Sequence, residues 1–537
     1  MLGQKKWKSV LLLLIAVMVL SITAIPGGNA YAMNVWGIYK EAQQLEAKGK
    51  YTEAIAKYKI IAAEFVKTQQ YGNASNIYRN IGADYSILGK YDDAVASWDL
   101  EALYAGKVGQ TQISIAAKRK ADALRSSAQL FVETEAAKLG NTNYHQAIFE
   151  PKNGALIGAY AELDPKVHNA KTSNPFYTEG FPQLTGKKHA AYLLYFTYGN
   201  PLSSLKSHIE EARANGTALQ LGIQPIKGLN QVQDDAYLHQ FAQEIADAGI
   251  PIFVRFANEM NGDWVPWNGN PKLYIEKFRL VANVIHKTAP DSAAMVWAPG
   301  QIPEYNIEDY YPGDAYVDWV GVSLYTIFNP TLDPLKKGED RSSHLDKFDL
   351  IYKLYADRKP VFISEGGVSY MYPEKLQDKT AWSSYQLKQF YMTLPMVYPK
   401  VKGVFYFDSN HDASNRVKYY MLSANAKLLE AYKQSIASPF YLSTVGDESP
   451  IAYRKISGAT VEASTQKVSA YVKSWTPILS KVTYEIGGKV VAATTQLPWK
   501  ASINFAVYKG KSITVVVKAY DSNGKLATTQ KVPVTVK

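Results

Sequence analysis

Two glutamates stand near the ends of predicted β-strands, and side chains of this type can perform acid–base and nucleophilic chemistry. Glu259 lies in the apolar run that begins at Ile250, and Glu365 lies in the run that begins at Lys359. In retaining glycoside hydrolysis, one carboxyl group protonates the leaving oxygen and later activates water, while the other attacks the anomeric carbon. A separation of about 5–5.5 Å leaves no space for an intervening water. The pair therefore predicts this chemistry, whereas either glutamate alone could be a helix cap or a surface charge.

The elements that must bring the glutamates together are eight short apolar runs, which alternate with helical stretches. The runs are Ala155–Leu163, Ala190–Gly199, Thr217–Ile226, Ile250–Asn261, Ala293–Gly300, Val317–Tyr325, Lys359–Gly367 and Val401–Asn410. Because a strand with its helix needs roughly 30 residues, this spacing predicts a (β/α)8 TIM barrel. Catalytic side chains project from the C-terminal strand ends of such barrels, so strands four and seven would deliver both glutamates to one mouth. An open doubly wound sheet is the alternative, but the Gly-rich turn that usually follows its first strand is not found after Ala155–Leu163.

The sequence around the first glutamate resembles a known signature. Residues 255–267, Arg-Phe-Ala-Asn-Glu-Met-Asn-Gly-Asp-Trp-Val-Pro-Trp, are similar to the acid/base segment of glycoside hydrolase family 26, whose best-known members are secreted β-mannanases. Three further segments also resemble family motifs: Gly158–Tyr160 in the first strand, Tyr311–Gly321 leading into the sixth, and Pro360–Glu365 in the seventh. The resemblance covers the barrel, about half of the 537 residues.

The resemblance implies roles for individual residues. Glu259 would be the general acid/base and Glu365 the nucleophile. Arg255 would line the site and lower the pKa of Glu365, because a nearby cation favours the carboxylate. An ionised Glu365 would in turn raise the pKa of Glu259. Tyr325, at the end of the sixth strand, would orient the nucleophile.

The resemblance and the local composition also predict where a sugar binds. Trp264, Trp267 and Trp297 offer aromatic faces on which sugar rings could stack, with ordinary core packing as the alternative. Trp319, in mid-strand, is expected to be a core residue. Asn258 departs from the family, which usually has histidine immediately before the acid/base, and resembles the wider clan in which asparagine hydrogen-bonds the 2-hydroxyl. The substrate is therefore open: β-mannan is the first expectation, with β-glucan, β-xylan or another exopolysaccharide as alternatives.

The regions on either side of residues 141–440 have different patterns. Residues 33–140 are expected to be helical, and Gly49–Ala54 is echoed by Gly89–Ala94, which resembles a tetratricopeptide repeat. Such a region could bind a protein or a cell-wall polymer, or only brace its neighbour. Residues 441–537 show short alternating strands and turn pairs such as Asn523-Gly524, which resemble an immunoglobulin-like β-sandwich.

The segment 1–32 is typical of a secretory signal peptide. Lys5, Lys6 and Lys8 precede the apolar stretch Val10–Pro26, and Ala30-Tyr31-Ala32 provides the small residues of a cleavage site. We expect an extracellular protein, cell-surface associated or free, with no membrane span after cleavage. An uncleaved anchor is the alternative, although the apolar stretch is short for a bilayer.

Composition excludes several other functions. The chain has no cysteine, which removes disulfides, thiolate metal sites and cysteine nucleophiles. The net charge is +11, but the basic residues are scattered among acidic ones, so nucleic-acid binding is not expected. Eight dispersed histidines disfavour a metal-dependent hydrolase or deacetylase, and neither a P-loop nor a dinucleotide motif is present, so no cofactor or metal is expected. A barrel that binds glycan at the cell surface without cleaving it remains the alternative to an enzyme.

Overall fold

The computed structural model describes residues 34–140, 143–167, 177–328, 344–413 and 416–537. The predicted signal segment lies outside these described residues. The chain forms two compact units, residues 1–118 and 119–537, and each is described by itself below. Within the described ranges, no helix combines the length and apolar character needed to cross a membrane.

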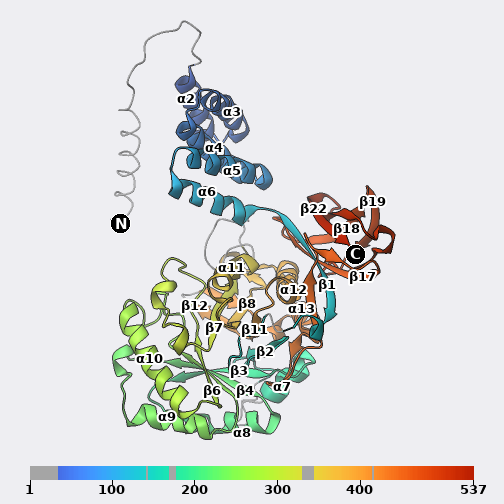
Figure 1. Cartoon of the computed structure of the whole chain (residues 1–537). Helices are drawn as coiled ribbons and strands as arrows, with labels where there is room; N and C mark the ends of the chain where they lie inside the picture. Colours follow the sequence, from blue (N-terminus) through green and yellow to red (C-terminus); the bar gives the residue numbers. More distant parts are fainter. Residues whose placement is uncertain (1–33, 141–142, 168–176, 329–343, 414–415) are drawn as a thin grey trace. The chain divides into compact units, whose positions relative to one another are not determined.

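The first unit consists of helices joined by short turns. Its helices are α2 (Val35–Ala47), α3 (Tyr51–Lys67), α4 (Tyr71–Ile87), α5 (Tyr91–Lys107) and α6 (Thr111–Leu124), the last of which continues into the second unit (Figure 1). The two echoed segments open α3 and α5, with α4 between them, so one period of the echo corresponds to two helices. Gly49, Gly89 and Gly109 take φ values of 72°, 68° and 72° in the turns, a conformation that glycine adopts without steric cost. Helical structure is confirmed here, whereas the tetratricopeptide assignment stays a prediction.

The expectation of helix up to residue 140 is wrong for its last part. After α6, residues Ser127–Glu135 form strand β1, which pairs antiparallel with β15 (Ile451–Lys455) and β17 (Thr465–Lys473). The whole barrel sequence lies between β1 and these partners, so no local pattern reveals the pairing. Leu130, Phe131 and Val132 are buried, which shows that the strand is part of a folded core.

The second unit contains a closed parallel barrel, which confirms the (β/α)8 prediction. Its strands are β2 (Ala155–Tyr160), β3 (Ala191–Thr197), β4 (Ala218–Gln224), β5 (Ile252–Phe256), β6 (Ala293–Trp297), β7 (Trp319–Thr326), β8 (Val361–Val368) and β11 (Val401–Phe407). Each strand pairs with the next, and β11 closes the barrel on β2. All eight predicted runs contain a barrel strand.

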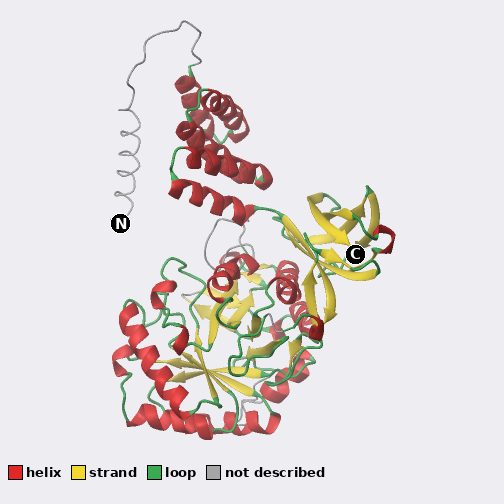
Figure 2. Ribbon diagram, in the orientation of Figure 1, coloured by secondary structure: helices red, strands yellow, loops and turns green. Residues whose placement is uncertain are grey.

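Helices surround the barrel (Figure 2). They are α7 (Tyr177–Thr185), α8 (Lys206–Asn215), α9 (Ala236–Asp247), α10 (Pro271–Thr288), α11 (His344–Tyr355), α12 (Thr380–Val397) and α13 (Ala426–Ile436). Between β6 and β7 the chain has two short 3₁₀ turns, Glu308–Tyr310 and Asp314–Tyr316, in place of an α-helix. Small additional strands decorate the barrel: β9 (Met371–Tyr372), β10 (Gln377–Asp378), β12 (Asn410–Ala413), β13 (Arg416–Tyr419) and β14 (Tyr441–Leu442).

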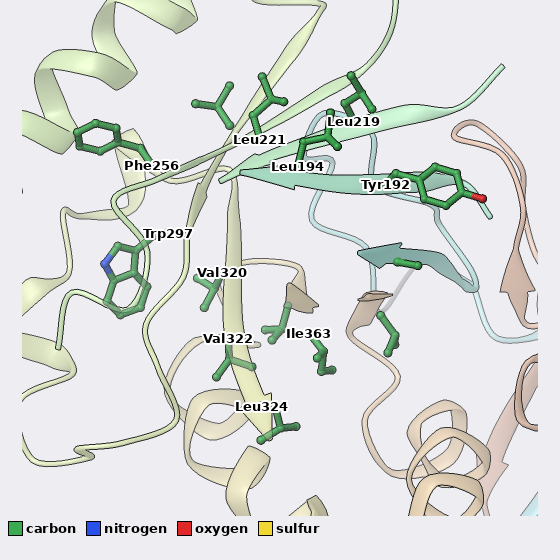
Figure 3. Close-up of a cluster of buried hydrophobic side chains, with 14 of the residues drawn as sticks. Tyr192, Leu194, Leu219, Leu221, Phe256, Trp297, Val320, Val322, Leu324 and Ile363 are labelled. Atoms are coloured by element: carbon green, nitrogen blue, oxygen red, sulfur yellow. The ribbon is translucent and has the colours of Figure 1, made fainter. Parts of the chain in front are cut away.

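Side chains alternate between the inside and the outside of the barrel along each strand. Outward side chains such as Val320, Val322 and Ile363 form the large apolar core beneath the helices (Figure 3). Inward side chains such as Phe253 and Trp319 fill the barrel interior, so the prediction of Trp319 as a core residue is confirmed. Because both faces are buried, the strands are almost continuously apolar.

The remainder of the second unit contains two further sheets, whose strands pair antiparallel except for one short parallel pairing. One has the order β15-β1-β17-β20, and the other has β16-β22-β21-β18-β19. The strands not yet given are β16 (Thr460–Val461), β18 (Leu479–Ile486), β19 (Lys489–Thr494), β20 (Ala501–Asn504), β21 (Ser512–Asp521) and β22 (Leu526–Val536). Their shared core also includes Tyr385 of α12, so this core joins the barrel to the sheets. The immunoglobulin-like assignment stays a prediction.

Candidate active site

Glu365 lies in β8 and receives hydrogen bonds from three other barrel strands. The hydroxyl of Tyr195 (β3) and Nη1 of Arg255 (β5) each donate to its Oε2 at 2.6 Å. The hydroxyl of Tyr325 (β7) donates to its Oε1. The residue is 6% exposed, so its carboxylate is largely shielded from solvent and is held by these three donors. A carboxylate held in this way has one defined orientation.

The same contacts set the ionisation of Glu365. Burial alone raises the pKa of a carboxyl group, because it disfavours the charged form. Here the positive charge of Arg255 and the hydrogen bonds from Tyr195, Tyr325 and Arg255 outweigh burial, and the pKa of Glu365 is lowered. The group is therefore a carboxylate at neutral pH, which is the state that a nucleophile requires.

Glu259 has the opposite electrostatic environment. It follows β5 in a tight turn, with a φ of 59°, and its amide donates to the carbonyl of Ala298 at 2.8 Å. Nε1 of Trp264 donates to its Oε2 at 2.6 Å. Burial, followed by the negative charge of Glu365, raises the pKa of Glu259, and Arg255 and hydrogen bonds from Ser323 and Trp264 offset only part of this rise. Glu259 can therefore hold a proton at a higher pH than an ordinary glutamate.

Arg255 connects the two glutamates from the barrel interior. It is fully buried, and while Nη1 binds Glu365, Nη2 donates to Oγ of Ser323 at 2.6 Å. Ser323 in turn hydrogen-bonds Glu259. A register shift between Val322 and Ser323 places Ser323 opposite Glu365 in the β7–β8 pairing. One guanidinium therefore contacts the nucleophile candidate directly and the acid candidate through a hydroxyl.

Trp264 is the predicted platform that the structure brings to the site. Its ring is 52% exposed while its Nε1 is bound to Glu259. The ring lies directly over Gly262, where an added Cβ would come within 2.3 Å of ring atoms. It also contacts Gly300, where an added Cβ would lie 3.3 Å from the ring. The two glycines thus contact the Trp264 ring, and about half of the residue stays exposed to solvent.

The predictions for the other two tryptophans are not supported by their positions. Trp297, labelled in Figure 3, is fully buried on the outer side of β6. It packs edge-on against Tyr311 and Tyr355. Its assignment as a sugar platform is wrong, because strand alternation directs it away from the barrel mouth. Trp267 is 3% exposed and donates from Nε1 to the carbonyl of Asn258 at 2.8 Å, so it supports the loop and offers no open face.

Asn258 lies immediately before Glu259 and is 4% exposed. Its Oδ1 is buried and has no hydrogen-bond partner in the described part of the chain. Because an unpaired buried carbonyl oxygen is costly, this atom is suited to accept a hydrogen bond from a ligand hydroxyl.

Sequence reasoning missed several aromatic side chains around Glu365. Tyr195 binds the carboxylate directly, and Tyr160 packs against Tyr195 with ring centroids 5.4 Å apart. Phe407, at the end of β11, stacks on Tyr160 at 4.8 Å, and Tyr420 packs against Tyr325 at 5.1 Å. A systematic list of polar and aromatic residues at the predicted strand ends would have included Tyr160, Tyr195 and Phe407. Tyr420 follows β13 and had no such signal.

Within the described residues, no group of three or more His, Cys, Asp or Glu side chains could hold a metal ion. The site described above presents two carboxyl groups, an arginine and aromatic side chains. A parallel eight-stranded barrel with two such carboxyl groups at one mouth is the arrangement that retaining glycosidases use.

Comparison with known protein families finds a match within the barrel. Residues 226–391, which contain both Glu259 and Glu365, match the family described as "Glycosyl hydrolase family 26". The match covers about a third of the chain and agrees with the family resemblance that the sequence motifs predict.

Individual relatives have low sequence identity or match only part of the chain. The chain is 23% identical over 313 residues to "Endoglucanase H" of Acetivibrio thermocellus, covering 55% of this chain and 31% of that protein. It is 30% identical over 93 residues to "Mannan endo-1,4-beta-mannosidase" of Bacillus subtilis, covering 16% of this chain and 25% of that one. The chain thus spans about a third or less of these relatives. Among solved structures, a modular endo-β-1,4-mannanase from Cellulomonas fimi is 20% identical with a TM-score of 0.41, covering 71% of this chain and 94% of that one.

Proposed function

We propose that this protein is a retaining glycoside hydrolase that cleaves a β-linked polysaccharide, with β-1,4-mannan as the first candidate. The observation that carries the proposal is the pair of opposite pKa shifts at one barrel mouth: that of Glu365 is lowered and that of Glu259 is raised. Two carboxyl groups with these shifts are the acid/base and nucleophile pair that double displacement needs.

The mechanism follows from these contacts. Glu365 attacks the anomeric carbon while Glu259 protonates the departing glycosidic oxygen, and a glycosyl ester forms on Glu365. Ester formation removes the negative charge of Glu365, so the pKa of Glu259 falls and its carboxylate can take a proton from water. That water attacks the anomeric carbon and releases the sugar with retained configuration. Tyr195 and Tyr325 keep the nucleophile aligned, and Arg255 balances its charge.

The choice of substrate rests on weaker observations. The family motifs and the mannosidase relative favour β-mannan, whereas the relative with the longest match carries an endoglucanase name. Asn258 bears on this choice, because it immediately precedes Glu259, its buried Oδ1 has no partner among the described residues, and the 2-hydroxyl is where mannose and glucose differ. β-Glucan and β-xylan therefore remain alternatives.

The flanking regions extend the proposal. The signal-like segment favours export to the cell surface or the medium. The helical first unit would contact a protein or a cell-wall polymer. The proposals of export and of a binding role for the helical unit do not depend on the proposed reaction at Glu259 and Glu365.

The test is release of reducing sugar from β-mannan, glucomannan, β-glucan and β-xylan by wild type, Glu259→Gln and Glu365→Gln. We expect release by the wild type alone, and the polymer that is cleaved identifies the backbone. Binding of the same polymers by Glu365→Gln, measured by affinity electrophoresis, separates lost chemistry from lost binding. A wild type that binds a polymer and cleaves none of them would instead support a glycan-binding protein without activity.

A further inference from the structure

Two aspartates are buried beside the aromatic side chains of the site, where the first and last strands close the barrel. Asp408 follows β11, and Asp164 lies in the loop after β2. Both side chains are fully buried. The amide of Asp408 donates to the carbonyl of Tyr160 at 2.7 Å, so the pair lies directly at the β2–β11 junction. No ion pair to either carboxyl group occurs in the described part of the chain.

Each carboxyl group uses its Oδ1 to hold one of two adjacent residues, Leu422 and Ser423. Oδ1 of Asp408 accepts from the amide of Leu422 at 2.6 Å. Oδ1 of Asp164 accepts from the hydroxyl of Ser423 at 2.6 Å and from the amide of Lys166 at 2.9 Å. Each Oδ2 is buried, and among the described residues no other group donates to it. The two carboxyl groups lie within hydrogen-bonding reach of each other.

This geometry requires a proton between the two carboxyl groups. Two facing carboxylates without a cation repel each other in a dry interior, and both cannot stay ionised. Burial, followed by the charge and hydrogen bond of Asp164, raises the pKa of Asp408 well above its ordinary value.

Among the described residues, the other titratable groups near the pair form no ion pair with either carboxyl group. Tyr406 of β11, Tyr370 after β8 and Tyr432 of α13 face Asp408, and burial raises the pKa of each, so they stay neutral. The ammonium of Lys166 donates to the carbonyl of Ser423 at 3.1 Å. The shared proton is therefore the means by which this site avoids a double negative charge.

The segment held by the pair, residues 420–423, carries Tyr420. Besides the two aspartates, the hydroxyl of Tyr406 donates to the carbonyl of Tyr420 at 2.6 Å, and Oδ1 of Asn410 accepts from the amide of Met421 at 3.1 Å. The Tyr420 ring packs against Tyr325, and an added Cβ at Gly367 would lie 3.0 Å from it. Tyr420 thus contacts the tyrosine that binds Glu365 and the strand that carries Glu365.

The geometry points to Asp164 and Asp408 as positioning residues, which share one proton and hold residues 420–423 so that Tyr420 keeps Tyr325 aligned on the nucleophile. This inference rests on the proposed function of Glu365. Loss of the proton at alkaline pH would place two like charges in a buried site, release Leu422 or Ser423, and loosen the contact between Tyr420 and Tyr325.

The test compares the full-length wild type with Asp164→Asn over pH 6–10. Asparagine keeps an oxygen acceptor for Ser423 and offers an N–H to Asp408 at every pH, so it reproduces the singly protonated pair. The substrate is a dinitrophenyl β-glycoside of the sugar that the polymer assay identifies, because this leaving group needs no proton from Glu259. We expect kcat/KM of the wild type to fall about tenfold per pH unit once the pH passes the raised pKa of Asp408, and this fall to be absent in Asp164→Asn. Asp309→Asn, which changes an exposed aspartate, should show the wild-type profile.

A second measurement does not depend on activity. A group whose pKa is raised by folding stabilises the fold fully below its ordinary range, and this contribution is lost as pH rises toward the folded pKa. The melting temperature of the wild type should therefore decline relative to Asp164→Asn as pH rises, and Asp164→Ala should melt lower than both at neutral pH. If both melting curves and kcat/KM profiles of Asp164→Asn parallel those of the wild type, the shared proton is refuted. If only the melting curves differ, the pair is structural and its positioning role is refuted. If no glycoside is cleaved, the proposed function fails, while the melting curves still show whether Asp164 and Asp408 share a proton.

Discussion

Removal of the Tyr195 hydroxyl should move the ionisation of Glu365 without disturbing the barrel. Tyr195→Phe keeps the ring and its packing on Tyr160 but loses the donor that lies 2.6 Å from Oε2. A hydrogen bond to a charged group contributes about 1.5–3 kcal/mol. One pKa unit corresponds to about 1.4 kcal/mol, so the pKa of Glu365 should rise by roughly 1–2 units. Arg255 and Tyr325 remain, which is why we expect a shift and not a loss of the carboxylate.

The assay is the pH dependence of kcat/KM on a soluble oligosaccharide of the cleaved polymer, because this parameter reports ionisations of the free enzyme. Catalysis needs Glu365 ionised, so the acidic limb should move toward neutral pH by about 1–2 units. The matched control is Tyr198→Phe, a buried tyrosine near the end of the same strand whose hydroxyl has no partner in the described part of the chain. An acidic limb that stays in place in Tyr195→Phe, or moves equally in the control, would refute this account of the nucleophile.

Three further outcomes are expected. Glu259→Gln should lower kcat on polysaccharide by about 10²–10⁴ but affect a dinitrophenyl glycoside far less in the first step; equal losses in pre-steady-state release of dinitrophenol and in polymer hydrolysis would contradict its role as acid. Trp297→Ala should destabilise the fold by about 3–5 kcal/mol in chemical denaturation, whereas Trp264→Ala should raise KM with a much smaller change in stability; the reverse pattern would contradict their assignments as core and platform. Gly262→Ala would place a Cβ within 2.3 Å of the Trp264 ring and should lower kcat/KM by displacing it, so an unchanged kcat/KM with a folded protein would show that the ring position does not matter.

The comparison of sequence and structure is clearest for the strand ends. Glu259, Glu365, Arg255 and Tyr325 were identified from motifs and strand spacing, and the structure brings all four together. Local sequence was sufficient here because each residue lies at or just beyond the end of a periodic element. The assignment of Trp297 as a platform failed, because a buried parallel strand is apolar on both faces and its pattern does not tell which side faces the barrel interior. Trp267 lies in the loop after β5, where it is buried and donates to the carbonyl of Asn258.

The carboxyl-terminal sheets show a second limit. Alternating residues and turn pairs predict strands β17, β18, β19, β21 and β22. The pattern of residues 33–140 predicts helix where the structure has β1. β1 pairs with β15 and β17, which lie more than 300 residues further along the chain, and Leu130 and Val132 are buried in the core of these sheets. The propensity of one short strand does not predict such a long-range pairing.

The sequence by itself determined the barrel, its strand spacing and the two glutamates, because these depend on the types and order of residues along the chain. Only the tertiary structure shows which neighbours lower the pKa of Glu365 and raise that of Glu259. Against burial, Arg255, Tyr195 and Tyr325 lower the pKa of Glu365, whereas burial and the charge of Glu365 raise the pKa of Glu259. The tertiary structure also brings Asp164 and Asp408, which lie near opposite ends of the barrel sequence, together in a buried site. Ionisation depends on burial and on neighbours in space, and these are properties that a chain acquires only when it has folded.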